Sequence, residues 1–258
     1  MGGAMLKGWL AAKSFSKIHV VEPNPTRALR RLAKEGNITL ATILHLDKGR
    51  EFSAAVLAIK PQILKEQTEM LRTLGESGAL VLSIAAGITA RALAVRLGGD
   101  VPIVRAMPNT PGAIGRGITG LYTPKKLKRS QRALAQQLVS ALGDSFWVAE
   151  EKLIDAVTAV SGSGPAYVFL FAESLAAAAC ERGLDAVTAD KLARATIIGA
   201  AALLEQDKRS TAMLRQEVTS PGGTTEEALK ILMGRDGMRP LIRSAVKAAA
   251  RRSKELGK

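Results

Sequence analysis

The sequence predicts an α/β domain built on a parallel sheet, followed by an all-α domain. Short apolar runs of strand length alternate with helical patterns up to about residue 150. Such alternation is typical of a parallel sheet that is covered by helices on both faces. Beyond this point the strand patterns disappear and long helical patterns take over. We therefore expect two domains, residues 1–150 and residues 151–258.

Strands are indicated by short apolar or β-branched runs that end in Pro, Gly, Asn or charged residues. They are expected at Lys17–Glu22, Ile38–Leu40, Ala54–Ile59, Ala79–Ile84, Val101–Met107, Ile118–Tyr122 and Ser145–Val148. Longer patterns with helical spacing lie around them. In the first domain these are Gly3–Lys13, Thr26–Lys34, Gln62–Leu74, Thr89–Leu97 and Leu127–Leu142, and in the second Ala166–Arg182, Val187–Glu205, Thr211–Val218, Glu226–Met233 and Met238–Glu255.

Composition excludes several classes of function. Hydrophobic residues make up 47% of the 258 residues, which indicates an ordered globular protein. The net charge is +14, but Lys and Arg are spread along the chain without aromatic interleaving or a nucleic-acid motif, so we expect no nucleic-acid partner. The two histidines are too few for a His-rich metal site, and we expect no metal.

Cysteine usage and hydropathy indicate a cytoplasmic protein that associates with itself. Cys180 is the single cysteine, so no intramolecular disulfide can form, and we expect it to be buried. No signal peptide is visible. The apolar run Ala166–Cys180 is short and contains Glu173, which argues against a membrane span and favours burial against a partner subunit.

Small and polar residues follow four of the expected strands. They are Glu22 with Asn24, Lys60 with Pro61, Ala85-Ala86-Gly87, and Asn109-Thr110-Pro111. Each set alone is weak evidence, because turns after strands commonly hold such residues. Together they line the carboxyl edge of one parallel sheet, where nucleotides bind in folds of this kind.

The start of the chain lacks one expected feature. A dinucleotide-binding domain begins with a strand and a G-x-G-x-x-G turn, whereas this chain runs from Met1-Gly2-Gly3-Ala4 directly into a helix. Gly2 matches the third glycine of that turn. We therefore expect the first strand and the first two glycines to lie upstream, through a misplaced start or a truncation. The absence of that central strand would leave its two neighbours unpaired.

The stretch Val218–Thr225 combines two glycines, a proline and several hydroxyls directly before a helical pattern. Gly222 and Gly223 expose main-chain N–H groups, and the N-terminus of the following helix favours an anion. A turn capped by Thr224 or Thr225 is the simpler alternative. A second glycine-rich stretch, Ser161–Pro165, favours a ligand-binding loop.

These stretches resemble the pyrroline-5-carboxylate reductase family over essentially the whole chain. The matching residues are Met1–Ala4, Ala58–Pro61, Ser83–Gly87, Arg105–Pro111, Asp155–Thr158, Ser161–Tyr167 and Val218–Thr225. The resemblance implies a Rossmann domain followed by a helical domain of the 6-phosphogluconate-dehydrogenase C-terminal type. It also implies dimers with interleaved C-terminal helices, which in this family often assemble into decamers.

The resemblance further implies a reaction, in which hydride passes from NADPH or NADH to the C=N carbon of 1-pyrroline-5-carboxylate and gives L-proline. By this similarity the N–H groups of Gly222, Gly223 and Thr224 and the Ser220 hydroxyl bind the substrate carboxylate. The Thr225 hydroxyl binds the ring nitrogen and is the catalytic group. Glu151 and Glu217 match positions near the substrate, although Glu217 departs from a neutral amide in the relative compared. For Glu151, a helix cap is the alternative.

The cofactor, either NADH or NADPH, is expected to bind along residues at the ends of the strands. By the same similarity these residues are Gly2, Asn24, Ala58, Ile59, Lys60, Pro61, Ala85 and Ala86. Preference between NADH and NADPH stays open. Glu22 suits a free ribose hydroxyl, whereas Asn24, Thr26 and Arg27 could hold a 2′-phosphate.

Two other functions remain as alternatives. A β-hydroxyacid dehydrogenase shares this architecture but uses a lysine about four residues after a glycine-rich segment, and Pro165, Ala166, Tyr167 and Val168 follow Gly164 here. An N-terminally truncated remnant would keep the dimer and the carboxylate loop but bind no dinucleotide.

Overall fold

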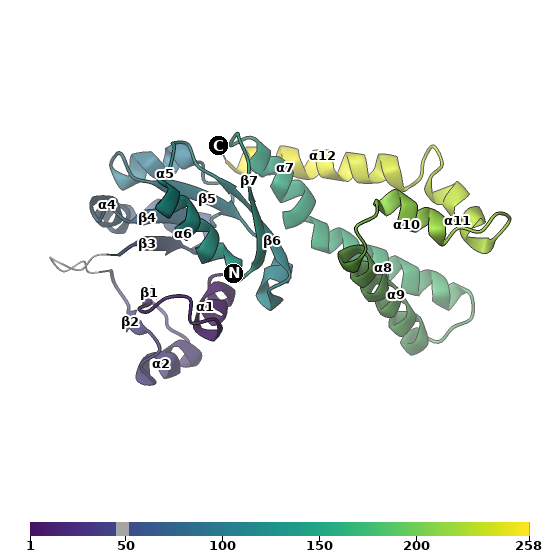
Figure 1. Cartoon of the computed structure of the whole chain (residues 1–258), viewed down its shortest axis with the longest axis horizontal. Coiled ribbons are helices and arrows are strands. Elements are labelled where there is room, and N and C mark those ends of the chain that lie inside the picture. The colour runs from purple at the N-terminus through teal and green to yellow at the C-terminus, as the bar shows by residue number, and fades with distance from the viewer. Residues whose placement is uncertain (45–51, 258) are drawn as a thin grey trace. The chain divides into compact units, whose positions relative to one another are not determined.

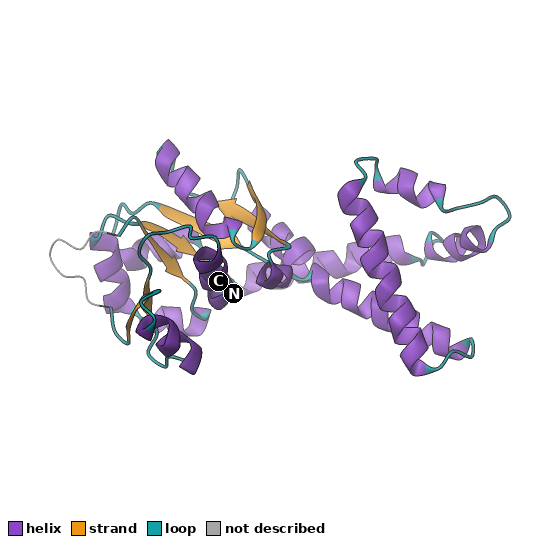
Figure 2. Ribbon diagram, turned by 60° about the horizontal axis from the view of Figure 1, so that its bottom comes forward, coloured by secondary structure: helices purple, strands orange, loops and turns teal. Residues whose placement is uncertain are grey.

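The computed structural model describes residues 1–44 and 52–257 (Figures 1 and 2). The chain divides into two compact units. Unit 1 comprises Met1–Gly162 and Ala250–Lys258, and unit 2 comprises Ser163–Ala249. Strands lie in unit 1 and unit 2 is built from helices (Figure 2). The expected domain limits of 1–150 and 151–258 stay a prediction.

Each expected strand is present, with ends shifted by a few residues. The strands are β1 (His19–Val21), β2 (Thr39–Ala41), β3 (Ala54–Leu57), β4 (Leu80–Ser83), β5 (Ile103–Met107), β6 (Gly117–Tyr122) and β7 (Gly143–Trp147). The helices of unit 1 are α1 (Gly2–Ala11), α2 (Arg27–Lys34), α3 (Pro61–Glu66), α4 (Thr68–Glu76), α5 (Ala90–Leu97), α6 (Arg129–Ser140) and α7 (Leu153–Val157). Short helical turns, η1 (Thr110–Ile114) and η2 (Thr158–Gly162), complete it.

The sheet is parallel except at one pair of strands. Strands β3, β4 and β5 run parallel in that order, and β6 runs parallel to β7. Strand β6 is antiparallel to β5, with Ala106 opposite Leu121. The short η1 connection explains this exception, because a parallel crossover needs a dozen or more residues.

Strands β1 and β2 form a separate parallel pair, with Val20 opposite Leu40 (Figure 1). In the described ranges 1–44 and 52–257, β1 pairs only with β2 and β3 pairs only with β4. The sheet is therefore divided between β1 and β3, and each of these strands keeps one edge without a neighbour. This agrees with the unpaired neighbours expected from the sequence.

Helix boundaries follow local chemistry at several points. Thr26 and Thr89 cap α2 and α5, since their hydroxyls accept hydrogen bonds from the N–H groups of Leu29 (3.3 Å) and Ala92 (3.1 Å). The single helix expected at Gln62–Leu74 is wrong in detail. It is divided at Gln67, whose φ of −89° and ψ of 52° leave the helical region. No Pro or Gly marks this break in the sequence.

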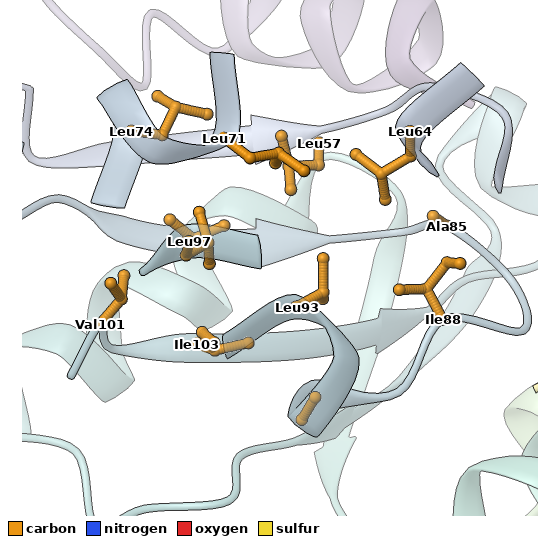
Figure 3. Packing of buried hydrophobic residues seen from close by; sticks show 12 residues of the cluster. Leu57, Leu64, Leu71, Leu74, Ala85, Ile88, Leu93, Leu97, Val101 and Ile103 are labelled. Carbon is orange, nitrogen blue, oxygen red and sulfur yellow. The ribbon is translucent and has the colours of Figure 1, made fainter. Parts of the chain in front are cut away.

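Helices α3, α4 and α5 cover one face of the sheet. Figure 3 shows Leu57 of β3 beside Leu64 and Leu71 from α3 and α4. On β4 and β5, Val81 and Ile103 belong to the same cluster. Alternate residues of a strand point to opposite faces of the sheet. The residues next to Val81 and Ile103 along β4 and β5 therefore face the other side of the sheet.

Helices α1 and α6 cover the opposite face. Leu80 and Leu82 of β4 and Val104 of β5 pack there with Met5 of α1 and Leu138 of α6. Trp9 of α1 also donates from Nε1 to the Leu138 carbonyl oxygen at 2.8 Å. The continuous apolar runs in the sequence are thus strands that are buried on both faces.

Unit 2 exposes much apolar surface on the single chain. It contains α8 (Gly164–Glu181), α9 (Ala186–Gln206), α10 (Thr211–Glu217), α11 (Thr224–Leu232) and most of α12 (Met238–Leu256). No residue of α8 is buried, and Phe169 is 67% exposed. Cys180 is also exposed on the single chain, so the expectation that it is buried is wrong here. The stretch Leu153–Glu181 is long and apolar enough to cross a membrane by length and composition alone, a test that core helices of soluble proteins also pass.

We predict that Gly75→Ala destabilises unit 1. A Cβ atom at Gly75 of α4 would lie 1.7 Å from the Leu97 carbonyl oxygen of α5, so the two helices must separate. The expected loss in the free energy of unfolding is about 3 kcal/mol. Both tryptophans, Trp9 and Trp147, lie in unit 1, so their fluorescence during denaturation reports on this unit.

Gly3→Ala is the matched control. A Cβ atom at Gly3 in α1 would meet no other atom within 4 Å. The change should therefore stabilise the helix by up to about 1 kcal/mol. Equal denaturation midpoints for Gly75→Ala and the unchanged protein would show that the α4–α5 contact is looser than described.

Candidate functional site

The start of α1 lies against the end of β3. A Cβ atom at Gly2 would lie 2.7 Å from the Cβ atom of Ala58, so only glycine fits at this position. Two residues expected to bind the cofactor, far apart in sequence, are therefore in contact. The N-terminal N–H groups of α1 also lie at this point, as an anion-binding helix start requires.

The loop after β1 is organised by Glu22. Its Oε1 atom accepts a hydrogen bond from the Asn24 N–H at 3.0 Å, while Thr26 caps α2. The side chain of Asn24 is exposed. Since one carboxylate oxygen of Glu22 binds the loop itself, this loop carries a fixed negative charge at the strand end.

The loop after β3 leads directly into α3. Lys60 is the N-cap residue with extended backbone angles, and Pro61 occupies the first turn. Ala58 and Lys60 are exposed, whereas Ile59 packs against the helices of its face. Ala58 and Lys60 are therefore accessible to a ligand, and Ile59 anchors the loop.

The loop after β4 is held closely by its surroundings. The buried Ser83 hydroxyl accepts from the Ala85 N–H at 3.3 Å, and Ala86 is exposed. Gly87 has a φ of 72°, and a Cβ atom there would lie 2.7 Å from the carbonyl oxygen of Leu256 in the last turn of α12. The end of α12, which belongs to unit 1, thus packs on this loop and also binds Asp155 through Ser253 at 2.6 Å.

Glu151 connects β5 to α5. Its Oε1 atom accepts from Nη1 of Arg105 at 2.6 Å and from the Ala90 N–H in the first turn of α5 at 2.7 Å. The Arg105 and Glu151 side chains are 11% and 27% exposed. Burial raises the pKa of Tyr122, opposite Arg105 on β6, and the Glu151 carboxylate raises it further.

The structure changes the interpretation of two expected features. Glu151 binds the N-terminus of α5, and not the helix that follows it in sequence. The stretch Ser161–Pro165 is helical, because Ser161 and Gly162 end η2 and α8 begins at Gly164. The Ser161 hydroxyl donates to the Val157 carbonyl oxygen at 3.0 Å, as helical serines often do. This stretch is therefore not a ligand loop of the expected kind.

The stretch Ser220–Thr225 in unit 2 is a tight turn that opens α11. Gly222 has a φ of 71°, and the N–H of Gly223 donates to the Ser220 carbonyl oxygen at 3.0 Å. The N–H of Gly222 donates to Oε2 of Glu226 at 2.7 Å. Gly223 is the N-cap residue of α11, so neither threonine caps the helix.

Glu217, at the end of α10, belongs to an ion-pair cluster. Its Oε2 atom accepts from Nη2 of Arg209 at 2.7 Å, and Arg209 also binds both carboxylate oxygens of Asp207. Hydrogen bonds from Arg209 lower the pKa of Asp207, and both carboxylates raise the pKa of Arg209. The negative charge of Glu217 is therefore balanced locally. Glu217 precedes the Ser220–Thr225 turn in the sequence, but its partner in the structure is Arg209.

Three residues with important contacts were not expected from the sequence. Arg105 lies inside an apolar strand run, Arg209 precedes a helix, and Glu226 lies in the first turn of α11. The sequence shows that Glu226 follows Gly222 by four residues, but the hydrogen bond between them is formed only in the folded turn.

Comparison with known proteins places this arrangement in a family. Residues 151–256 match the family model for pyrroline-5-carboxylate reductase dimerisation. A pyrroline-5-carboxylate reductase of Pseudomonas aeruginosa is 43% identical over 201 residues, covering 78% of this chain and 73% of the relative. The chain belongs to the pyrroline-5-carboxylate reductase family. The relative from Synechocystis sp. is 37% identical and covers 100% of this chain and 95% of its own length.

Solved structures of this family have the same fold. The pyrroline-5-carboxylate reductase of Coxiella burnetii superposes with a TM-score of 0.90 at 36% identity, covering 100% of this chain and 95% of that chain. A pyrroline carboxylate reductase of Plasmodium falciparum with NADP bound gives a TM-score of 0.78 at 26% identity, covering 100% and 96%. The Rossmann-type sheet and the helical dimerisation domain expected from the sequence are thereby confirmed.

We predict that the Arg105–Glu151 pair stabilises unit 1. Removal of one partner leaves the other charge poorly solvated, so Arg105→Ala and Glu151→Ala should each lower the free energy of unfolding by about 1–3 kcal/mol. The double variant should lose less than the sum of the two, as measured by tryptophan fluorescence during denaturation.

Tyrosine titration gives a second readout. In Glu151→Gln the negative charge next to Tyr122 is lost, so the pKa of Tyr122 should fall toward its ordinary value. Tyr167 is the other tyrosine of the chain, and a Tyr167→Phe background isolates the signal. An unchanged pKa of Tyr122 in Glu151→Gln would show that the charge of Glu151 does not act on this tyrosine.

Proposed function

We propose that this chain reduces the C=N bond of 1-pyrroline-5-carboxylate to L-proline with NADPH or NADH, the last step of proline synthesis. The observation that carries this proposal is a carboxylate on the Ser220–Thr225 turn. Oε2 of Glu226 accepts the Gly222 N–H at 2.7 Å, so the main chain of this turn is already oriented toward a carboxylate oxygen. A substrate carboxylate has the same chemistry. The relatives from Pseudomonas aeruginosa and Synechocystis sp., both pyrroline-5-carboxylate reductases, support the same reaction.

The substrate-binding residues in this proposal come from one short turn. The N–H groups of Gly222, Gly223 and Thr224 and the Ser220 hydroxyl bind the carboxylate. The start of α11 adds a favourable electrostatic field for an anion. Glu151 and Glu217 are proposed to lie near the substrate, each with an arginine partner in the structure, Arg105 and Arg209 respectively.

The proposed cofactor-binding residues lie at the start of α1 and at the ends of strands. Only glycine fits at Gly2 beside Ala58, and the N–H groups at the start of α1 favour a pyrophosphate. Asn24, Lys60, Pro61, Ala85 and Ala86 continue this edge, and Ile59 anchors it. A nicotinamide cofactor bound here supplies the hydride.

The chemical role of this chain is to hold and polarise the substrate. The turn fixes the carboxylate, and the Thr225 hydroxyl donates a hydrogen bond to the ring nitrogen. This hydrogen bond stabilises electron density that moves to nitrogen as the imine carbon is reduced. The nitrogen gains a proton in the same overall reaction, which needs no metal ion.

We propose a cytoplasmic protein with a dinucleotide-binding domain at 1–150 and a substrate-binding and dimerisation domain at 151–258. The exposed apolar side chains of α8 support a dimer in which a second copy, and not a membrane, covers them. A decamer assembled from five such dimers is the larger assembly that we propose.

The function is tested by assaying the purified protein with 1-pyrroline-5-carboxylate and either NADPH or NADH. Loss of nicotinamide absorbance with formation of L-proline is the expected result. Proline-dependent reduction of NAD(P)⁺ at alkaline pH is the reverse assay. A folded protein without activity in either direction would refute the proposal.

Thr225→Ala should lower kcat/KM by about ten-fold or more, since a hydrogen bond of about 1.5–3 kcal/mol to the reacting ring is lost. Thr225→Ser keeps the hydroxyl and should retain most of the activity. Equal kcat/KM for Thr225→Ala and the unchanged enzyme would exclude the hydroxyl from the mechanism.

Glu22→Gln should change the choice between the two cofactors. The fixed charge of Glu22 at the end of β1 disfavours a 2′-phosphate, whereas a neutral amide does not. The ratio of kcat/KM for NADPH to that for NADH should therefore rise roughly five-fold to ten-fold. An unchanged ratio would place the 2′ position of the cofactor away from Glu22.

A further inference from the structure

Glu226 holds the main chain of the substrate turn in this structure. Its Oε2 atom accepts the Gly222 N–H at 2.7 Å, and Gly222 has a left-handed φ of 71° that turns this N–H toward the helix. The adjacent Glu227 makes a different contact, with its Oε1 atom 2.5 Å from Nζ of Lys230. Two consecutive carboxylates on α11 therefore have separate roles.

We propose that Glu226 competes with the substrate carboxylate for the turn and thereby sets the affinity for the substrate. This inference rests on the proposed function, because it assigns the Gly222 N–H to the substrate. One N–H group cannot make a strong hydrogen bond to both carboxylates, and two negative charges at one helix start repel each other. Binding of the substrate therefore displaces the Glu226 side chain.

The structure provides a place for the displaced side chain. A hollow beside the turn is lined by Glu226, Lys230, Arg215, Thr219 and neighbouring residues of α10 and α11. Lys230 lies four residues after Glu226 on the same helix, which is the favourable spacing and order for a Glu–Lys pair. Nζ of Lys230 already contacts Oε1 of Glu227, so a Glu226 side chain that moves into the hollow shares this lysine with Glu227.

This competition reduces affinity without changing the chemistry. The apparent dissociation constant equals the intrinsic constant divided by the fraction of chains whose turn is free. Removal of Glu226 raises that fraction, so it lowers KM for the substrate. The step that reduces the imine follows displacement and involves Thr225, so kcat should be unaffected.

The test compares Glu226→Gln with Glu227→Gln. Both changes remove one negative charge from the first turn of α11, but only the first removes the carboxylate bound to Gly222. In steady-state assays of the full-length enzyme, Glu226→Gln should lower KM for 1-pyrroline-5-carboxylate about three-fold or more with kcat within about two-fold. Glu227→Gln leaves the Gly222 hydrogen bond in place and only frees Lys230, so it should lower KM much less than Glu226→Gln does.

Glu226→Ala and a binding measurement complete the design. Alanine cannot accept the Gly222 hydrogen bond, so its KM should be at least as low as that of Glu226→Gln. Calorimetric titration with L-proline, which carries the same carboxylate, should show a parallel gain in affinity. This readout does not depend on turnover.

A raised or unchanged KM in both Glu226 variants would overturn the inference, since Glu226 would then only order the turn. An equal fall in KM for Glu227→Gln would also overturn it, because a general charge effect would explain the result. Both outcomes leave the proposed function intact if the unchanged enzyme forms L-proline. Absence of that activity refutes the proposed function itself and the inference with it.

Discussion

Burial of β4 on both faces is the constraint that organises unit 1. Leu80, Val81, Leu82 and Ser83 are at most 2% exposed, because helices pack against the sheet from either side. A strand in this position has no room for charged chemistry along its length. Polar and conformationally special residues are therefore confined to the strand ends, and the residues proposed to bind the cofactor gather there.

The strand-end loops in turn depend on hydrogen bonds to main-chain N–H groups. Glu22 binds the Asn24 N–H, Ser83 binds the Ala85 N–H and Glu151 binds the Ala90 N–H. A free N–H at a helix start or turn needs an acceptor, and oxygen-bearing side chains supply one. In unit 2, Glu226 does the same for Gly222. Where such an acceptor is part of the protein, a ligand can bind only by adding to it or displacing it.

Much of this structure could be predicted from local sequence. Apolar runs bounded by turn residues correctly located the strands, since burial on both faces leaves a strong signal. Gly2 and the turn at Gly222 were also recognisable, because close approach and a left-handed φ demand glycine. The parallel sheet was predicted correctly, and the antiparallel β5–β6 pair is an exception for which the short link after Met107 contained the necessary information.

Contacts between residues distant in sequence could not be predicted in this way. Arg105 lies in an apolar strand, and no residue near it in the sequence indicates that it binds Glu151, which is 46 positions away. The break at Gln67 and the helical conformation of Ser161–Gly162 also depend on packing, because propensity alone favoured other outcomes. The sequence therefore indicated where turns and strand ends lie, but not which side chains, such as Arg105 and Glu226, bind there.

The long helices of unit 2 bury few side chains in the single chain. The buried residues of α9 are Ala189 and Ala193, whereas Ile198 is 68% exposed, and α8 has no buried residue at all. Two small side chains cannot offset the conformational entropy of ordering such long helices. The match to a dimerisation domain explains how the remaining apolar surface is covered. We therefore expect the order of α10, α11 and the turn between them to depend on assembly, which would make self-association a condition for forming the proposed carboxylate site.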